Sequence, residues 1–383
     1  MFIGTREGQY VEQIEGYKAF IPNPLPPKPE IIMDQEMWDL LSQADRALGR
    51  LDGATDALPN PDLFVFMYVR KEAVLSSQIE GTQASLIDVL EFESQALEPN
   101  NPQEVAEVVN YIAAINYGLE RLKSFPVSLR LIREIHKELL MQGVRGAERD
   151  PGEFRRTQNW IGGGGCSLND ATYVPPPPHE MLQSLDNLEK FLHSPQPIPT
   201  LIKVGLAHAQ FETIHPFLDG NGRTGRLLIT FLLCEKNILQ RPLLYISHYF
   251  MKYRSEYYDR LQAIRESGNW EGWLKFFLRG VYEVAQEAAA TARKIVKLKE
   301  EHRQLVLNTM GRKSGNAIAL LESLYLRPIF NVEHAEKITS LSYPNANALI
   351  KALSDIGLVE ETTGQKRNRA FSYAPYLAVL RDS

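Results

Sequence analysis

HPFLDGNGRTGR, the stretch from His215 to Arg226, places an imidazole, a carboxylate, a glycine-rich turn and two guanidinium groups within twelve residues. Each group alone has an ordinary structural explanation, because histidines are commonly buried, GNG sequences commonly form turns and paired arginines commonly lie on solvated helix faces. Together they serve one kind of chemistry, the handling of a phosphate chain. The stretch therefore predicts a binding site for the phosphates of a nucleotide.

The centre of the stretch, Gly-Asn-Gly at residues 220–222, favours an anion-binding turn. Glycine adopts positive φ angles at little cost, so successive backbone N–H groups can point at one anion. Leu and Ile recur at helical spacing from Arg223 to Lys236, which places the turn at a helix N-terminus, where the helix dipole also favours negative charge. Arg226 lies three residues after Arg223, so both guanidinium groups can bind one phosphate chain.

Asp219 and His215 supply the remaining chemical functions. Mg²⁺ takes one or two protein carboxylates together with phosphate oxygens and water, so Asp219 predicts a magnesium-nucleotide complex. His215 precedes Pro216, whose ring restricts the backbone, and its imidazole is the obvious base for an attacking hydroxyl. We assign Phe217 to packing beneath the loop.

A hydrolytic metal site is an alternative for the same region. His208 and Glu212 fall one helical turn apart, and with His215 and Asp219 they would form a metal-binding cluster. Pro216 argues against this cluster, since it breaks the helical register between the two halves. Neither the glycine turn nor the arginines would be needed to activate water.

The whole stretch resembles the signature of the Fic family, HPFx(D/E)GNGRxxR, at every specified position. The resemblance implies a mainly α-helical core and an adenylyltransferase that moves AMP from ATP to a Ser, Thr or Tyr hydroxyl of a target protein, with release of pyrophosphate. It implies that His215 is the general base and that Asp219 binds Mg²⁺. It also implies phosphate contacts from five residues: Gly220, Asn221, Gly222, Arg223 and Arg226. Attack at the α-phosphorus needs the leaving pyrophosphate held and neutralised, which these groups provide.

A second motif, SSQIEG from Ser76 to Gly81, ends an apolar stretch with helical spacing. By itself, a Glu-Gly pair there is commonly a surface residue before a helix C-cap. The resemblance adds that the motif matches the family's inhibitory pattern, Ser/Thr-x-x-x-Glu-Gly/Asn. It implies an inhibitory segment, residues 76–81, in which Glu80 pairs with Arg226 and takes the donors that the γ-phosphate needs. In some relatives this glutamate also assists removal of AMP, and that activity is left open.

Four consecutive glycines, Gly162 to Gly165, interrupt the stretch from Phe154 to Val174, ahead of the four prolines Pro175 to Pro178. With Ile161 and Tyr173 on either side, the pattern predicts a β-hairpin ended by proline. A flexible loop is the other explanation, and a P-loop is disfavoured because no GKS or GKT follows. In the family, a short β-hairpin flap near the motif binds the target's backbone by strand addition.

Length and composition indicate a globular protein. The 383 residues suffice for two or three domains, with 44% hydrophobic residues to form a core. The net charge of −5 argues against general nucleic-acid or membrane affinity. Two cysteines, Cys166 and Cys234, make no disulfide framework, and neither a secretory signal nor a membrane span is recognisable. We therefore expect a cytoplasmic protein.

The chain divides into three expected domains. Residues 1–118 hold a proline-rich arm, extended over about the first 33 residues, and a helical N-terminal lobe that contains the inhibitory segment. Residues 119–290 form the Fic-type core, which is mainly α. Residues 291–383 hold a linker helix and a winged-helix domain.

The last part of the chain resembles a winged helix-turn-helix. Three short helices are expected at Ala317–Leu326, Val332–Ile338 and Tyr343–Ile356, and Val359–Glu361 and Ala370–Tyr373 are expected to form a two-stranded wing. Residues placed to contact DNA are Ser342, Tyr343, Asn345, Asn347, Lys366, Arg367 and Arg369. Winged helices also bind proteins or dimerise, and both roles are left open.

Two functional hypotheses follow. The first is a protein adenylyltransferase that uses Mg²⁺ and ATP, acts on a target protein and is autoinhibited through Glu80. The second is a winged-helix DNA-binding regulator whose Fic core senses nucleotide. A base placed at His215 favours the enzyme, because a sensor has no need of one. Another donor, such as GTP or UTP, and a homodimer are left open.

Overall fold

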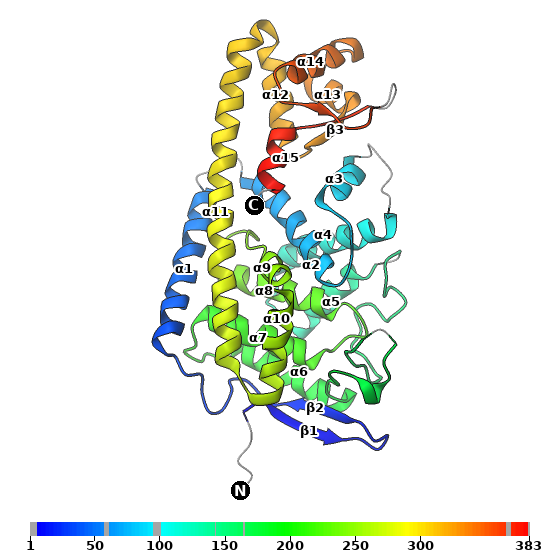
Figure 1. The fold of residues 1–383 in the computed structure, drawn as a ribbon, viewed down its shortest axis with the longest axis vertical. Coiled ribbons are helices and arrows are strands. Elements are labelled where there is room, and N and C mark those ends of the chain that lie inside the picture. Colours follow the sequence, from blue (N-terminus) through cyan, green and yellow to red (C-terminus); the bar gives the residue numbers. More distant parts are fainter. Residues whose placement is uncertain are drawn as a thin grey trace.

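The computed structural model describes residues 6–56, 61–94, 101–141, 143–163, 165–364 and 369–381. These residues form a mainly helical, elongated molecule (Figure 1). Its longest element is α11, the 40-residue helix Trp270–Thr309, which runs along the core and continues to the C-terminal elements. A buried apolar stripe on α11 packs against α1, Gln35–Asp56, and this contact joins the N-terminal lobe to the core.

The inhibitory segment lies at the C-terminal end of α2, Pro61–Ile79. This helix begins at Pro61, a position where proline is tolerated because the first N–H groups of a helix have no intrahelical acceptor. After the helix, the chain turns at Gly81, which has a φ of 100°. α3, Leu86–Ser94, and α4, Pro102–Leu122, complete the lobe. α2 packs on α4, and the expected domain boundary at residue 118 falls inside α4.

The core is built from six helices in the described part of the chain between residues 129 and 267. They are α5, Leu129–Leu139; α6, Pro178–His193; α7, Thr200–Ile214; α8, Asn221–Glu235; α9, Ser247–Lys252; and α10, Arg254–Ser267. α7 and α8 are buried on nearly all sides. The turn that joins them runs from His215 to Gly220, so the stretch from His215 to Arg226 lies at the centre of the core.

The N-terminal arm differs from the expected extended segment. β1, Gly8–Glu12, and β2, Lys18–Pro22, form an antiparallel hairpin in which Tyr10 lies opposite Phe20. The proline cluster begins only at Pro22, so the residues before it keep the N–H groups that strand pairing requires. The buried Phe20 donates its N–H to the Val174 carbonyl at 2.9 Å, which ties the hairpin to the core.

The expected hairpin in the glycine-rich segment is reduced to a single bridge. Ile161 and Tyr173 exchange backbone hydrogen bonds at 2.8 and 3.0 Å, and the described residues from 154 to 174 contain no strand. A short 3₁₀ helix, Leu168–Asp170, lies between them. The hairpin fails to form because glycines offer no side chains for cross-strand pairs and Pro175–Pro178 offer no N–H groups.

The C-terminal elements include the three expected helices in order, together with an unexpected strand, β3, and an unexpected last helix, α15. They are the 3₁₀ turn Gly311–Lys313; α12, Ser314–Leu324; β3, Ile329–Asn331; α13, Val332–Thr339; α14, Tyr343–Asp355; β4, Glu360–Glu361; β5, Ala370–Ser372; and α15, Ala374–Arg381. The strands form one antiparallel sheet in the order β3-β5-β4. Lys366 and Arg367 lie outside the described residues. The expected boundary at residue 290 falls inside α11.

Candidate active site

The turn between α7 and α8 begins and ends with a left-handed backbone conformation. His215, with φ 51°, is the C-cap of α7 and donates its N–H to the Phe211 carbonyl at 2.9 Å. Gly220, with φ 73°, is the N-cap of α8. The first N–H groups of α8, from Asn221 to Arg223, have no carbonyl partner within the helix. These N–H groups lie where the sequence predicts an anion site, at a helix N-terminus.

Two side chains hold this turn in shape. The Asn221 amide donates to the Phe217 carbonyl and accepts from the Phe217 N–H, both at 2.8 Å. His136 of α5 stacks on the Phe217 ring, and its Nδ1 accepts from the Gly152 N–H at 2.8 Å. Its Nε2 therefore carries the proton and donates to the Asp219 carbonyl at 3.0 Å. The Asn221 side chain is thus used within the turn, and its backbone N–H is the group left for a phosphate.

The environment of His215 keeps its imidazole neutral. Burial, reinforced by the positive charges of Arg265 and Arg155, lowers the pKa of His215 to about 3. Its Nδ1 is buried and has no hydrogen-bond partner in the described part of the chain. Arg155 Nε donates to the His215 carbonyl at 3.0 Å and fixes the backbone. The imidazole is therefore unprotonated at physiological pH, which is the form that a general base must have before it accepts a proton.

Asp219 and Arg223 meet at the start of α8. Asp219 Oδ1 accepts from the Gly220 N–H at 2.6 Å and lies 3.5 Å from Arg223 Nη2. The Arg223 side chain is 1% exposed, and its Nε and Nη1 lack hydrogen-bond partners among the residues that the structure describes. Buried guanidinium donors of this kind are suited to an anion that binds during function.

Magnesium fits beside Asp219 as the partner of a bound phosphate. The Asp219 side chain is partly exposed, so a ligand can reach its carboxylate. Within the described ranges, no three His, Cys, Asp or Glu side chains form a group that could hold a metal by themselves. One carboxylate combined with phosphate oxygens and water is the coordination that Mg²⁺ commonly has in nucleotide sites.

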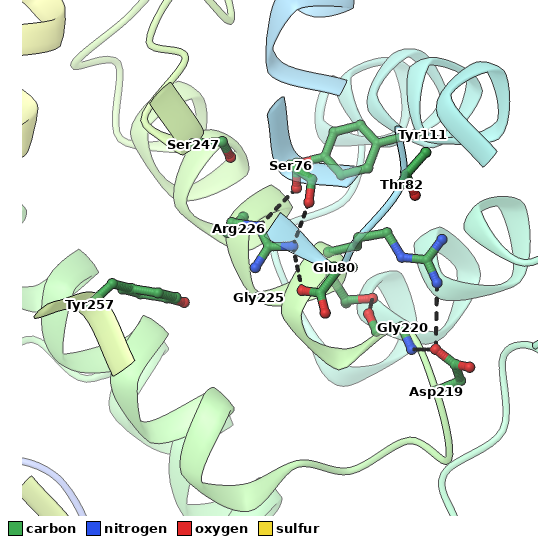
Figure 2. Close-up of polar contacts among 12 residues, drawn as sticks. Ser76, Glu80, Thr82, Tyr111, Asp219, Gly220, Gly225, Arg226, Ser247 and Tyr257 are labelled. Carbon is green, nitrogen blue, oxygen red and sulfur yellow. Dashed lines mark hydrogen bonds and ion pairs between the residues drawn. The ribbon is translucent and has the colours of Figure 1, made fainter. Parts of the chain in front are cut away.

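The expected inhibitory segment, residues 76–81, binds Arg226 (Figure 2). Arg226 Nη2 donates to Glu80 Oε1 at 2.7 Å and to the Ser76 carbonyl at 3.0 Å, and its Nε donates to Ser76 Oγ at 2.8 Å. The Arg226 side chain is 1% exposed. Gly81, with its positive φ, turns the chain away directly after Glu80. The structure therefore brings together Arg226 and the segment that the second motif marks.

The Glu80 carboxylate covers the first turn of α8. A Cβ atom at Gly222 would lie 2.3 Å from Glu80 Oε1, so the absence of a side chain at Gly222 permits this approach. Burial opposes ionisation of Glu80, but the charge and hydrogen bond of Arg226, aided by the charge of Arg223, hold its pKa below the usual value. A negative charge therefore lies where the helix N-terminus favours an anion.

The alternative metal cluster is not formed. His208 Nδ1 lies 2.9 Å from the Gly225 carbonyl and its Nε2 lies 3.0 Å from the Tyr257 hydroxyl, so core contacts use both ring nitrogens. Burial lowers the pKa of His208 to about 3 and raises the pKa of Glu212 to about 7. His208 thus helps α7 to pack against α8 and α10.

Glu72 is a buried polar residue that neither motif marks. It lies on α2, four residues before Ser76, so both occupy the helix face that Glu80 continues. Its carboxylate accepts from the Ser247 hydroxyl at 2.5 Å, the Ser247 N–H at 3.1 Å and the Tyr111 hydroxyl at 3.3 Å. Burial raises its pKa to about 7. Polar residues at helical spacing within an apolar helix are the signal that identifies such a residue.

Two family models match the chain. The Fic/DOC family N-terminal model matches residues 38–120, and the Fic/DOC family model matches residues 126–233, which include the whole active-site turn. Residues 126–233 are therefore similar to a Fic domain. α2 and the Glu80 region lie within the first match, while His215, Asp219 and both arginines lie within the second.

Curated proteins similar to this chain are named protein adenylyltransferase Fic. The one from Aedes aegypti is 30% identical over 247 residues, which cover 61% of this chain and 44% of that protein. The one from Drosophila mojavensis is 26% identical over 305 residues, which cover 76% of this chain and 54% of that protein. The chain therefore spans about half the length of these relatives.

Solved structures confirm the mainly α, Fic-type fold. A Fic family protein from Desulfovibrio desulfuricans G20 has a TM-score of 0.57 and 18% identity, covering 90% of this chain and 97% of that one. Fic-1 from C. elegans, residues 134–508, has a TM-score of 0.51 and 20% identity, covering 68% of this chain and 74% of that one. These likenesses extend well beyond the Fic domain in this chain.

Proposed function

We propose that the chain is a protein adenylyltransferase that transfers AMP from Mg-ATP to a Ser, Thr or Tyr hydroxyl of a target protein. The observation that carries the proposal is the turn between α7 and α8, where a neutral His215 lies a few residues before the N-terminus of α8. There Arg223 Nε and Nη1 have no hydrogen-bond partner among the residues that the structure describes. A base and a phosphate site are the parts that this transfer requires. The name of the similar proteins agrees with this reaction.

The phosphates would bind at the N-terminus of α8. The backbone N–H groups of residues 221–223 would bind the α- and β-phosphates, and Arg223 would donate from Nε and Nη1 to the β-phosphate. Asp219 would hold Mg²⁺, which when bound neutralises charge on the phosphate chain. His136 and Asn221 keep these groups in position, because they fix the turn on both sides of Phe217.

His215 would act on the target's hydroxyl. It accepts the hydroxyl proton as the oxygen forms its bond to the α-phosphorus, and the bond from that phosphorus to the bridging oxygen breaks. Pyrophosphate leaves with its charge held by the α8 N–H groups and Arg223. Asn159 Nδ2 donates to the Phe217 carbonyl at 2.8 Å, so the segment that holds the four glycines begins beside the turn. This contact supports the proposal that the segment is the flap that binds the target.

Inhibition in cis by Glu80 is the second part of the proposal. Glu80 and Ser76 use the Arg226 donors that a γ-phosphate would need, and Glu80 lies against Gly222 at the helix N-terminus. ATP would therefore have to displace the carboxylate before its phosphates reach a productive position. Removal of AMP by the same glutamate stays an open alternative.

The test is transfer of label from α-labelled ATP to lysate proteins in the presence of Mg²⁺. It compares the wild type, Glu80→Gly, and Glu80→Gly combined with His215→Ala. We expect strong labelling with Glu80→Gly alone. If no variant transfers α-label although ATP binds, adenylyl transfer is rejected, and labelled GTP and UTP then test the other donors.

The DNA-binding role of the C-terminal domain stays a prediction. Arg369 donates to the Asn347 side chain and lies 3.4 Å from Glu361, so two residues expected to face DNA pair with each other. A DNA titration at several salt concentrations separates a true DNA-binding regulator from a protein-binding module. No helix in the described ranges is both long and apolar enough to span a membrane. The cytoplasmic location and a homodimer also stay predictions.

A further inference from the structure

Glu107 lies where the inhibitory segment meets the phosphate site. It belongs to α4, is 4% exposed, and its Oε2 accepts from the Thr82 hydroxyl at 3.0 Å. Thr82 is also buried and follows Glu80 by two residues. The contact therefore fixes the backbone directly after the inhibitory glutamate.

The same carboxylate faces two arginines. Glu107 Oε2 lies 3.7 Å from Arg223 Nη1, and Oε1 lies 3.8 Å from Arg145 Nε. A buried carboxylate requires such counter-charges, because an isolated charge is costly to remove from water. Arg145 Nη2 also donates to the Glu80 carbonyl at 3.4 Å, so this group of residues contacts the inhibitory segment at Glu80 and the chain directly after it at Thr82.

The negative charges of two carboxylates hold the Arg223 guanidinium in place, although they do not use all of its hydrogen-bond donors. Its guanidinium lies between Asp219, at 3.5 Å, and Glu107, at 3.7 Å, and both distances exceed those of ordinary hydrogen bonds. Its Nε and Nη1 have no hydrogen-bond partner in the part of the chain that the structure describes. This arrangement suits a cation that is oriented in advance for an anionic ligand.

We propose that Glu107 is a positioning residue with two separable effects. It orients Arg223 toward the bound phosphates, and through Thr82 it holds the inhibitory segment in place. The inference rests on the proposed function of the site and adds a residue to it. Loss of the first effect weakens nucleotide binding, whereas loss of the second relieves inhibition. The two effects can be separated by mutation, because Thr82 takes part only in the second.

The test measures ATP affinity by calorimetry with Mg²⁺, and labelling by α-labelled ATP, in the full chain. In a Glu80→Gly background the inhibitory carboxylate is absent, so only the orienting effect remains. There we expect Glu107→Gln, which keeps an acceptor for Thr82, to weaken ATP binding roughly tenfold. We expect Thr82→Val in that background to change the affinity by less than about twofold.

In the background with Glu80 intact, the second effect becomes visible. We expect Thr82→Val to raise the labelling rate by roughly two- to tenfold, since the hydrogen bond that anchors the chain directly after the inhibitory segment is lost. An unchanged labelling rate would overturn the proposal that Glu107 supports inhibition through Thr82.

Glu104→Gln is the matched control. Glu104 lies one turn earlier on α4, and its Oε2 accepts from the Gln83 N–H at 2.6 Å. In the Glu80→Gly background we expect this control to leave ATP affinity within about twofold. Unchanged affinity for a folded Glu107→Gln protein, or an equal loss in the control, would overturn the orienting effect.

Two further measurements keep the test decisive. Circular dichroism and thermal melting check that each variant folds, and Glu107→Asp, which keeps the charge but withdraws it by one methylene, replaces Glu107→Gln if that variant unfolds. If the proposed function itself fails, no variant transfers α-label. The calorimetric comparison then still decides whether Glu107 orients Arg223.

Discussion

Replacing Glu80 with glycine is expected to make the chain more active and less stable at once. Glu80 follows the last residue of α2, so glycine there costs little helix propensity. The change removes the carboxylate from Arg226, whose side chain is 1% exposed. In the free protein this buried guanidinium then lacks its charge partner, whereas in the complex with ATP the γ-phosphate takes that place.

The size of both effects follows from the Glu80–Arg226 contact. It is a single charge-assisted hydrogen bond of 2.7 Å, worth about 1.5–3 kcal/mol. Since about 1.4 kcal/mol corresponds to a factor of ten, productive ATP binding should improve about tenfold to a hundredfold. The Glu80 side chain is 31% exposed, so the loss in free energy of unfolding should be about 1–3 kcal/mol, less than for a fully buried pair.

The assay is the initial rate of labelling from α-labelled ATP at concentrations well below saturation, with urea unfolding of the same proteins. Glu80→Gln is measured as well, because it removes the charge and keeps the shape. Glu93→Gln is the control. Glu93 of α3 forms an equally short ion pair with Arg70 of α2, the helix that Glu80 follows. Equal rates for the wild type and both Glu80 variants would refute the reasoning, as would an equal gain with Glu93→Gln.

Three further predictions concern residues around the turn. In the Glu80→Gly background, His215→Ala should lower transfer by about a hundredfold or more but leave calorimetric ATP affinity unchanged; a matching loss of affinity would contradict its role as base. Asn221→Ala should lower the free energy of unfolding by about 1–3 kcal/mol, because the Phe217 backbone loses two partners, and an unchanged urea midpoint would disprove this. The folded-state pKa of Glu72, about 7, exceeds its ordinary value of 4.5, so its protonated form contributes stability that is lost as pH rises from 4.5 to 7. Glu72→Gln should remove up to about 3 kcal/mol of this pH dependence, and parallel urea stability curves for both proteins between about pH 5 and about pH 8 would contradict it.

The groups within the active-site turn were predictable because they are contiguous. His215, Asp219 and Arg223 lie within nine residues of chain, and glycine and proline restrict the backbone between them. The distant partner was not predictable from physics. Nothing in SSQIEG alone points to Arg226, which lies 146 residues from Glu80, and only the family resemblance connected the two.

Sequence analysis did not identify the residues that contact the turn only through tertiary packing. His136, Arg155 and Glu107 come from separate parts of the chain, and no spacing relates them to the motif. The sequence offers one indirect signal, a charged residue within an otherwise apolar helix. Glu72 and Glu107 are such residues, and each requires a partner because burial of an unpaired charge is costly.

Helices were predicted more accurately than strands for a physical reason. A helix repeats its apolar pattern over several turns, whereas the strands here have two to five residues. β1 and β2 were therefore missed, and so was β3. The glycine-rich segment shows the opposite error, because turn-forming residues indicated a hairpin where only the Ile161–Tyr173 bridge forms.

The two arginines of α8 are in different states, and this difference would explain how the proposed phosphate site could stay inactive in the proposed autoinhibition. Arg226 has hydrogen bonds to Ser76 and Glu80, whereas Arg223 keeps donors without hydrogen-bond partners in the described part of the chain. The first two phosphates of ATP would meet available groups, but the third would have to displace Glu80. That displacement costs about one charge-assisted hydrogen bond, which a binding partner can supply. Under the proposed inhibition, activation would require movement only at the end of α2, while the turn between α7 and α8 would stay as it is.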